Sequence, residues 1–108
     1  MVTINIAKDY TKTPGGRLSS EGEFSGEDFR EKVLAPKYYE AKKAHDNLTV
    51  ILDGGYGYAT SFLEEAFGGL ARKTGDPDLL KICIVSEEEP ALIGKIETYI
   101  NDALADVR

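Results

Sequence analysis

Hydrophobic and polar positions alternate at the start of the chain and then give way to longer patterns. Isoleucines at alternate positions predict a strand with one buried face over residues 3–10. Residues 11–26 are rich in glycine, proline and serine and are expected to form a loop, with a short returning strand around residues 17–20. The run LTVILD, residues 48–53, is apolar and β-branched, which is typical of a central strand buried on both faces.

Helical patterns lie between the strands. Ser25 followed by Asp28 is typical of a helix N-cap, so a helix is predicted from there. This helix is expected to break at Ala35, because Pro36 disfavours helical backbone in the residue before it. A second helical piece is expected over residues 37–44.

The C-terminal half continues the alternation. Helices are predicted over residues 61–74 and 90–107, with a strand over residues 80–85 between them. The order of elements predicts a single α/β domain, residues 1–108, with a mixed four-stranded sheet and helices packed on it. Because a helix connects residues 48–53 to residues 80–85, these two segments are expected to be interior parallel strands.

Composition and charge limit the class of partner. The chain has 108 residues, a formal net charge of −6 and a pI near 4.8. These values argue against nucleic acid or a membrane surface as the main partner, because both need clustered Lys and Arg. No segment is long and apolar enough to span a bilayer and no signal peptide is evident, so we expect a cytoplasmic protein. The single cysteine, Cys83, lies in an apolar run and is expected to be buried.

The stretch DGGYGYATSFLEEAFGGL, residues 53–70, carries the most informative chemistry. Asp53 ends a predicted strand, and the crevice outside the carboxyl ends of strands is where α/β sheets usually bind ligands. The glycines supply positive φ angles or close backbone approach, and the tyrosines supply apolar rings with polar tips. The candidate partner or ligand loop consists of Asp53, Gly54, Gly55, Tyr56, Gly57 and Tyr58.

The helix after this loop is predicted to begin at Ser61, which forms a capping box with Glu64. Gly68 and Gly69 fall away from the centre of the face that packs on the sheet, and each costs about 1 kcal/mol relative to alanine in a helix interior. Two interpretations stand: close packing of a neighbouring helix, or a smooth surface on which another protein docks. The candidate docking surface consists of Phe62, Glu65, Gly68 and Gly69.

Catalytic and metal-binding chemistry is poorly supported. A P-loop is excluded because no Gly-Lys-Ser/Thr run follows the glycines. A hydrolase using Ser61 needs a base, but the only histidine, His45, is expected at the opposite end of the sheet from Asp53. With one cysteine and one histidine far apart, no metal and no cofactor is expected, and the protein is predicted not to be an enzyme. The loop amides at the helix N-terminus stay a candidate anion site.

Residues 53–70, with PGGR and SGEDFRE upstream, resemble the small bacterial STAS-like domains of unknown function. That family is a distant relative of the STAS domains, which are named for sulfate transporters and anti-sigma factor antagonists. The resemblance implies a STAS-like fold. In the antagonists, an ATP-binding anti-sigma kinase phosphorylates a serine or threonine at a helix N-terminus, and Thr60 and Ser61 are the counterparts here. Where the antagonists typically have an Asp-Ser-Ser-Gly-like run, this sequence has ATSF.

The resemblance also draws attention to Arg17 and Arg30, which together with Glu27 form a candidate ion-paired clamp holding the long loop near the sheet. Solvated surface charge is the alternative.

Two functional hypotheses follow. The first is a non-enzymatic regulatory module, resembling an anti-sigma factor antagonist, that docks a protein through loop 54–59 and the helix beginning at Ser61. Thr60 or Ser61 is then the phosphoacceptor, and the resemblance implies a GHKL-type ATP-binding protein or kinase as the partner. The alternative is a small-ligand-binding or anion-binding α/β domain that uses the loop amides at the helix N-terminus.

Overall fold

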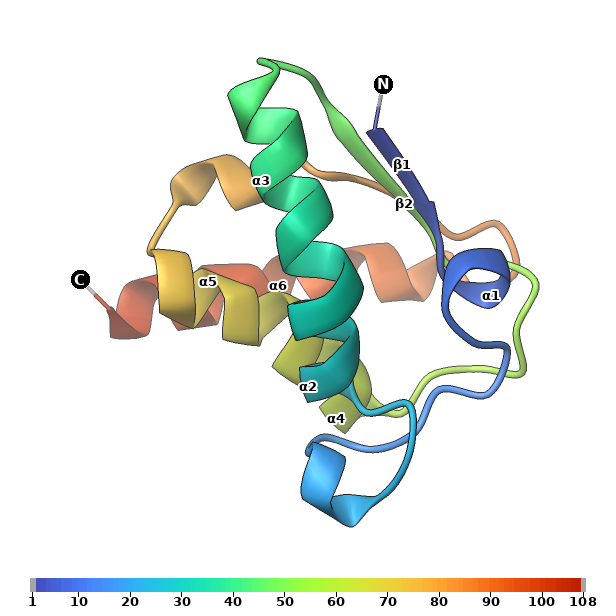
Figure 1. Cartoon of the computed structure of the whole chain (residues 1–108). Helices are drawn as coiled ribbons and strands as arrows, with labels where there is room; N and C mark the ends of the chain where they lie inside the picture. The colour runs from blue at the N-terminus through green and yellow to red at the C-terminus, as the bar shows by residue number, and fades with distance from the viewer. Residues whose placement is uncertain (1, 108) are drawn as a thin grey trace.

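The computed structural model describes residues 2–107, which alternate short strands with helices around one hydrophobic core (Figure 1). Within this part of the chain, no helix is both long and apolar enough to pass through a membrane. In chain order the elements are β1 (Val2–Asn5), α1 (Ile6–Asp9), the 3-10 turn η1 (Ser19–Glu21), α2 (Gly26–Phe29), the π-helical turn η2 (Arg30–Leu34), α3 (Ala35–Lys43), β2 (Leu48–Ile51), α4 (Thr60–Leu63), the π-helical turn η3 (Glu64–Gly68), α5 (Gly69–Thr74), the 3-10 turn η4 (Pro77–Lys81), β3 (Cys83–Val85) and α6 (Ala91–Asp106).

Two of these helices are continuous runs that change winding partway. Residues 26–43 form the first run and residues 60–74 form the second. The N-cap of the first run is confirmed, because the Ser25 hydroxyl accepts a hydrogen bond from the Asp28 amide at 3.0 Å. The break predicted at Ala35 is wrong. The helix widens into η2 before Pro36 instead of ending, and this turn contains the carbonyl four residues earlier against which a proline ring clashes.

The predicted α/β class is confirmed, but over residues 2–107 the sheet has three parallel strands in the order β1-β2-β3, so the predicted four mixed strands are not confirmed. No strand forms at residues 17–20. That segment instead bends into η1, where the Glu21 side chain accepts a hydrogen bond from the Leu18 amide at 2.8 Å and closes the loop on itself. β2 is interior and parallel to β3, as predicted, but β3 lies at an edge of the sheet.

The described helices cover one face of the sheet. Ile4 and Val50 are partners across β1 and β2, and both side chains are buried beneath the helices. The next row belongs to the opposite face, because successive strand residues point to opposite sides. Cys83 lies in that row at the edge of the sheet and is exposed, so the prediction of a buried thiol is wrong.

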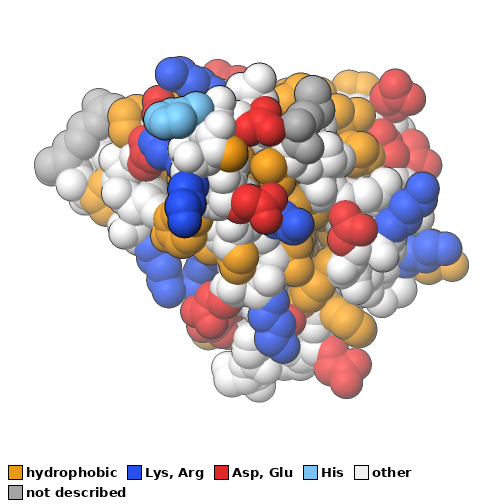
Figure 2. Space-filling view, turned by 45° about the horizontal axis from the view of Figure 1, so that its top comes forward, with side chains coloured by type: hydrophobic (Ala, Val, Ile, Leu, Met, Phe, Trp, Pro, Cys, Tyr) orange, Lys and Arg blue, Asp and Glu red, His pale blue; other side chains and the backbone are white. Residues whose placement is uncertain are grey.

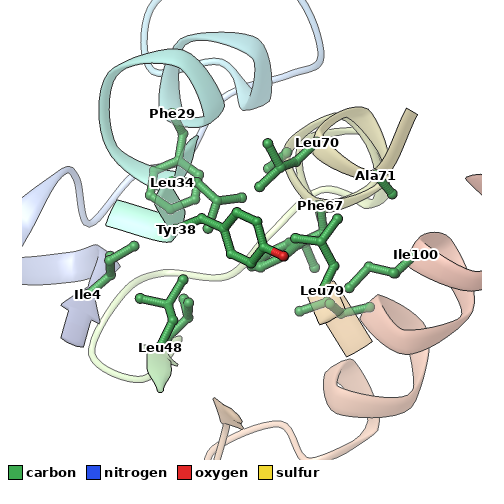
Figure 3. Packing of buried hydrophobic residues seen from close by; sticks show 14 of the residues in the cluster. Ile4, Phe29, Leu34, Tyr38, Leu48, Phe67, Leu70, Ala71, Leu79 and Ile100 are labelled. Carbon is green, nitrogen blue, oxygen red and sulfur yellow. The ribbon is translucent and has the colours of Figure 1, made fainter. Parts of the chain in front are cut away.

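The core joins the sheet to three helical layers. The 60–74 helix packs between the 26–43 helix and α6, and α3 contacts β1 and β2 (Figure 1). Phe29 and Phe62 stack with ring centroids 5.7 Å apart and pack the 26–43 helix against the 60–74 helix. Figure 3 shows Ile4, Phe29, Leu34, Tyr38, Leu48, Phe67, Leu70, Ala71, Leu79 and Ile100 in this cluster.

Candidate functional site

The glycine-rich loop is tied to the neighbouring strand connection. The Asp53 carboxylate accepts hydrogen bonds from the amides of Glu87 and Glu88 at 3.0 and 2.9 Å. In return, the Glu88 carboxylate accepts a hydrogen bond from the Gly54 amide at 2.6 Å. These bonds join the segments that follow β2 and β3, and both lie at the carboxyl edge of the sheet as predicted for Asp53.

The three loop glycines meet different backbone requirements. Gly54 and Gly57 have φ angles of 97° and 118°, which L side chains rarely adopt, so the predicted positive φ is confirmed at these two positions. Gly55 instead allows close approach, since a Cβ there would lie 3.1 Å from the Lys12 carbonyl oxygen. The next amide, from Tyr56, donates to that same oxygen at 2.9 Å. The loop is therefore held to the N-terminal segment as well.

The two tyrosines of the loop have different roles. Tyr58 is partly buried, donates a hydrogen bond from its hydroxyl to the Leu52 carbonyl at 2.8 Å, and packs on Phe62. Burial, with the nearby charges of Asp53 and Glu88, raises the pKa of Tyr58 to about 12. Tyr56 is 86% exposed. Tyr58 thus holds the loop in place, while Tyr56 is presented to solvent.

An open hollow of about 340 Å³ lies beneath this loop, and its lining is acidic. Asp53, Glu88 and Glu89 contribute three carboxylates to the lining. The Gly54 amide, which an anion would need, already donates to Glu88. This arrangement argues against the alternative hypothesis of an anion site built from the loop amides. Among the described residues, no group of three or more His, Cys, Asp and Glu side chains is arranged to hold a metal ion.

The helix begins one residue earlier than predicted, at Thr60, with Ala59 as its N-cap and no side-chain cap bond. The capping box of Ser61 with Glu64 is therefore wrong. Glu64 instead accepts hydrogen bonds from Arg17 and Arg72, and bonds from two guanidinium groups are stronger than one from a neutral amide. Thr60 is exposed and Ser61 is partly buried.

The predicted docking surface on the flank of this helix is wrong. Phe62, Gly68 and Gly69 are buried, and the Glu65 side chain is only 15% exposed. A Cβ on Gly69 would overlap the Arg30 guanidinium, and a Cβ on Gly68 would meet the Glu64 carboxylate. The glycines thus permit close packing, which is the other interpretation that the sequence allows.

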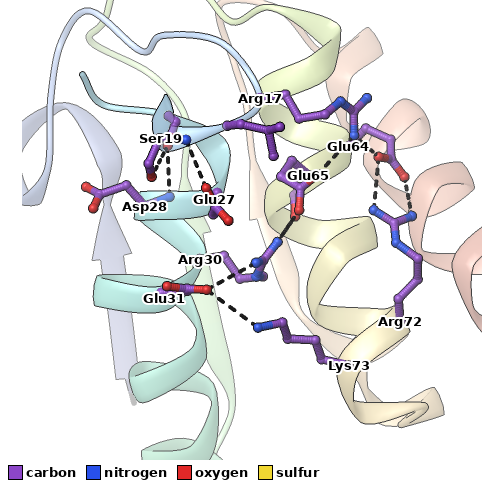
Figure 4. A network of polar contacts seen from close by, with 12 residues as sticks. Arg17, Ser19, Glu27, Asp28, Arg30, Glu31, Glu64, Glu65, Arg72 and Lys73 are labelled. Carbon is purple, nitrogen blue, oxygen red and sulfur yellow. Dashed lines mark hydrogen bonds and ion pairs between the residues drawn. The ribbon is translucent and has the colours of Figure 1, made fainter. Parts of the chain in front are cut away.

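The predicted clamp exists but has different partners. Arg17 pairs with Glu64 and with Glu65, the latter at 3.2 Å, so the long loop is held to the 60–74 helix (Figure 4). Arg30 is buried and pairs with the Glu65 carboxylate, while one of its Nη atoms donates to the Glu65 carbonyl at 2.9 Å. Glu27 accepts a hydrogen bond from the backbone amide of Ser19 at 2.9 Å.

Glu64 and Arg72 also belong to this network, although neither was predicted as a member of the clamp. Their nitrogen and oxygen atoms lie 2.7 Å apart, and the hydrogen bond from Arg72 is the main cause that lowers the pKa of the Glu64 carboxyl. The two residues are eight positions apart on one helical run, a spacing that places them near the same face. This spacing is the sequence feature from which the pairing of Glu64 with Arg72 could have been predicted.

The single histidine lies far from the loop. His45 precedes β2 and Asp53 follows it, so the two residues lie at opposite ends of the strand, as predicted. Figure 2 shows the face that carries His45, where acidic and basic side chains are interspersed. His45 and Ser61 are therefore separated by strand β2 and the loop that follows it.

These features describe a small α/β domain that presents a fixed loop at the carboxyl edge of a parallel sheet. The chain belongs to the family of STAS-like domains of unknown function (DUF4325), whose model matches residues 25–90. The resemblance carried by residues 53–70 is thereby confirmed, while Arg17 lies outside the matched range. Searches among curated proteins and solved structures found no match to the chain.

Proposed function

We propose that this protein is a non-enzymatic regulatory module that docks a protein partner through loop 54–59 and the exposed start of the helix at Thr60. The main support is the exposure of Tyr56, whose side chain is 86% exposed. Hydrogen bonds hold its loop to Lys12 on one side and to Glu88 on the other. A rigid exposed aromatic loses little conformational entropy on binding, and such residues commonly dominate interface energies. The buried residues Phe62, Gly68 and Gly69 are not part of this surface.

The docking is switched by phosphorylation of Thr60 or Ser61. The partner is a GHKL-type ATP-binding kinase, the class implied by the relationship to anti-sigma factor antagonists. The terminal phosphoryl group of ATP passes to the hydroxyl oxygen of this protein: the new P–O bond forms, the bond to ADP breaks, and the hydroxyl proton is released. The dianion must then be desolvated or repelled when the partner approaches, which weakens docking. Exposure of Thr60 at the helix start supports access by such a kinase.

Affinity capture from a lysate of the source cell, followed by mass spectrometry, tests this proposal. The bait is compared with Tyr56→Ala and with a matched control, Tyr39→Ala, which removes another exposed tyrosine from the distant helix α3. We expect bait and control to capture an ATP-binding protein equally, and Tyr56→Ala to capture at least about tenfold less, a loss of about 1.4 kcal/mol. Equal capture by Tyr56→Ala would remove the main support for docking at this loop.

A further inference from the structure

Arg17 is held by two carboxylates that do not depend on it. Its Nη1 atom contacts Glu64 and lies 3.2 Å from Glu65. Glu64 also pairs with Arg72 at 2.7 Å, and Glu65 also pairs with Arg30. Each carboxylate therefore keeps an arginine if Arg17 leaves, so no unpaired charge is left behind.

Of the two arginines that pair with Glu65, Arg17 is the one suited to move. The Arg30 side chain is 5% exposed and is enclosed between two helices, whereas the Arg17 side chain is 38% exposed. The backbone of Arg17 is fixed, because its carbonyl accepts a hydrogen bond from the Glu27 amide at 3.0 Å. Movement of its guanidinium is thus a rotamer change that leaves the loop in place.

The anion that Arg17 can reach lies one helical turn earlier. Ser61 precedes Glu64 by three positions and Glu65 by four, and residues at these spacings are neighbours on one helix face. Helical side chains also lean toward the N-terminus of their helix. Figure 4 shows Arg17 on the α4 side of both glutamates.

We propose that Arg17 is the internal receiver of a phosphate on Ser61, leaving Glu64 and Glu65 to Arg72 and Arg30. This inference rests on the phosphorylation switch of the proposed function. A phosphate dianion repels the two glutamates and attracts Arg17, and a guanidinium can bind it with two parallel hydrogen bonds. The exchange keeps the phosphate folded against the helix start, where the helix dipole also favours it.

The test uses the full chain with phosphoserine installed at position 61 by genetic code expansion, so no kinase or partner is needed. The phosphate pKa is followed by ³¹P NMR in the otherwise unchanged chain, in Arg17→Gln and in Lys95→Gln, which removes the same charge from the exposed face of α6. We expect Arg17→Gln to raise the phosphate pKa by about 0.5 unit or more. The Lys95→Gln control should leave it unchanged. Equal values in the two variants would overturn the proposal.

A second measurement does not depend on the folding of a variant. The arginine Nε–Hε resonances of the chain are compared before and after phosphoserine is placed at position 61. The Arg17 signal should shift most, with a smaller shift for Arg72 and the least for buried Arg30. An unmoved Arg17 signal would overturn the proposal. If either NMR experiment fails, the proposal that a partner docks through Tyr56 still stands. If the capture experiment fails, the move of Arg17 to the phosphate can still be measured.

Discussion

Gly69 lies against the guanidinium of Arg30 and the carboxylate of Glu65, and this contact decides what its replacement does. Helix propensity alone favours alanine by about 1 kcal/mol. Packing opposes it, because an added Cβ must push a buried, ion-paired arginine out of place. The neighbouring Gly68 meets the far ends of two more exposed side chains, Glu64 and Arg72, so its replacement is better tolerated.

Gly69→Ala should therefore destabilise the protein by about 1–3 kcal/mol in urea unfolding. Gly94→Ala is the matched control, since Gly94 lies in α6 with no atom close to an added Cβ. It should stabilise the protein by up to about 1 kcal/mol. A Gly69→Ala protein as stable as Gly94→Ala would mean that the Arg30 contact does not constrain this position.

Two serines near helix starts should respond differently to alanine. Ser25 is a buried N-cap whose hydroxyl accepts the Asp28 amide, so Ser25→Ala should lose about 1 kcal/mol of stability. Ser61 makes no side-chain cap bond, so Ser61→Ala should change the unfolding free energy by less than about 0.5 kcal/mol. Paired chemical unfolding of both variants checks this, and a loss at Ser61 as large as that at Ser25 would contradict it.

At the scale of elements, Asp76 ties α3 to the segment before β3. Its carboxylate accepts hydrogen bonds from the Tyr38 hydroxyl at 2.7 Å and from Lys42 at 2.8 Å. It also caps η4 through the Asp78 amide at 3.0 Å. The bond from Lys42 is the largest cause that lowers the pKa of Asp76 to about 2.

This depressed pKa gives a pH-dependent prediction. Asp76 is ionised more readily in the folded than in the unfolded chain, so its contribution is complete above the ordinary pKa of 3.8 and is lost as pH falls toward 2. Asp76→Asn should lower the unfolding free energy by about 1–2 kcal/mol at pH 7. The difference from the unchanged protein should shrink between pH 4 and about pH 2. A difference that stays constant over this range would contradict the linkage.

Across the fold, features that depend on neighbours in sequence were predicted better than features that depend on contacts between distant residues. The N-cap at Ser25, the position of Asp53 at the carboxyl edge and a strand within LTVILD depend on neighbours in sequence and are confirmed. The strand covers Leu48–Ile51 and is fully buried on one face only, so the predicted burial of both faces is wrong. The Glu21 side chain closes a turn around residues 18–21 by accepting a hydrogen bond from the Leu18 amide. The sequence pattern does not show that this turn forms instead of the predicted strand. The role of Gly69 depends on Arg30, which lies 39 positions earlier and meets it only in the folded chain.

The net charge of −6 also bears on docking, because the loop surface contributes carboxylates of Asp53, Glu88 and Glu89 to it. Under the proposed function, a phosphate dianion at Ser61 would add to this field on the surface proposed for docking. The fold should tolerate the added charge at a helix start, whereas the interface should not. Partner affinity and stability should therefore respond separately to charge at Ser61.

Titration of the captured ATP-binding partner against the unchanged protein and against Ser61→Asp tests this claim most directly. Ser61→Asp should unfold within a few degrees of the unchanged protein but bind more than about tenfold more weakly, a loss of about 1.4 kcal/mol. Equal affinity for the two proteins, with both folded, would contradict the claim that Ser61 lies at a switched docking surface.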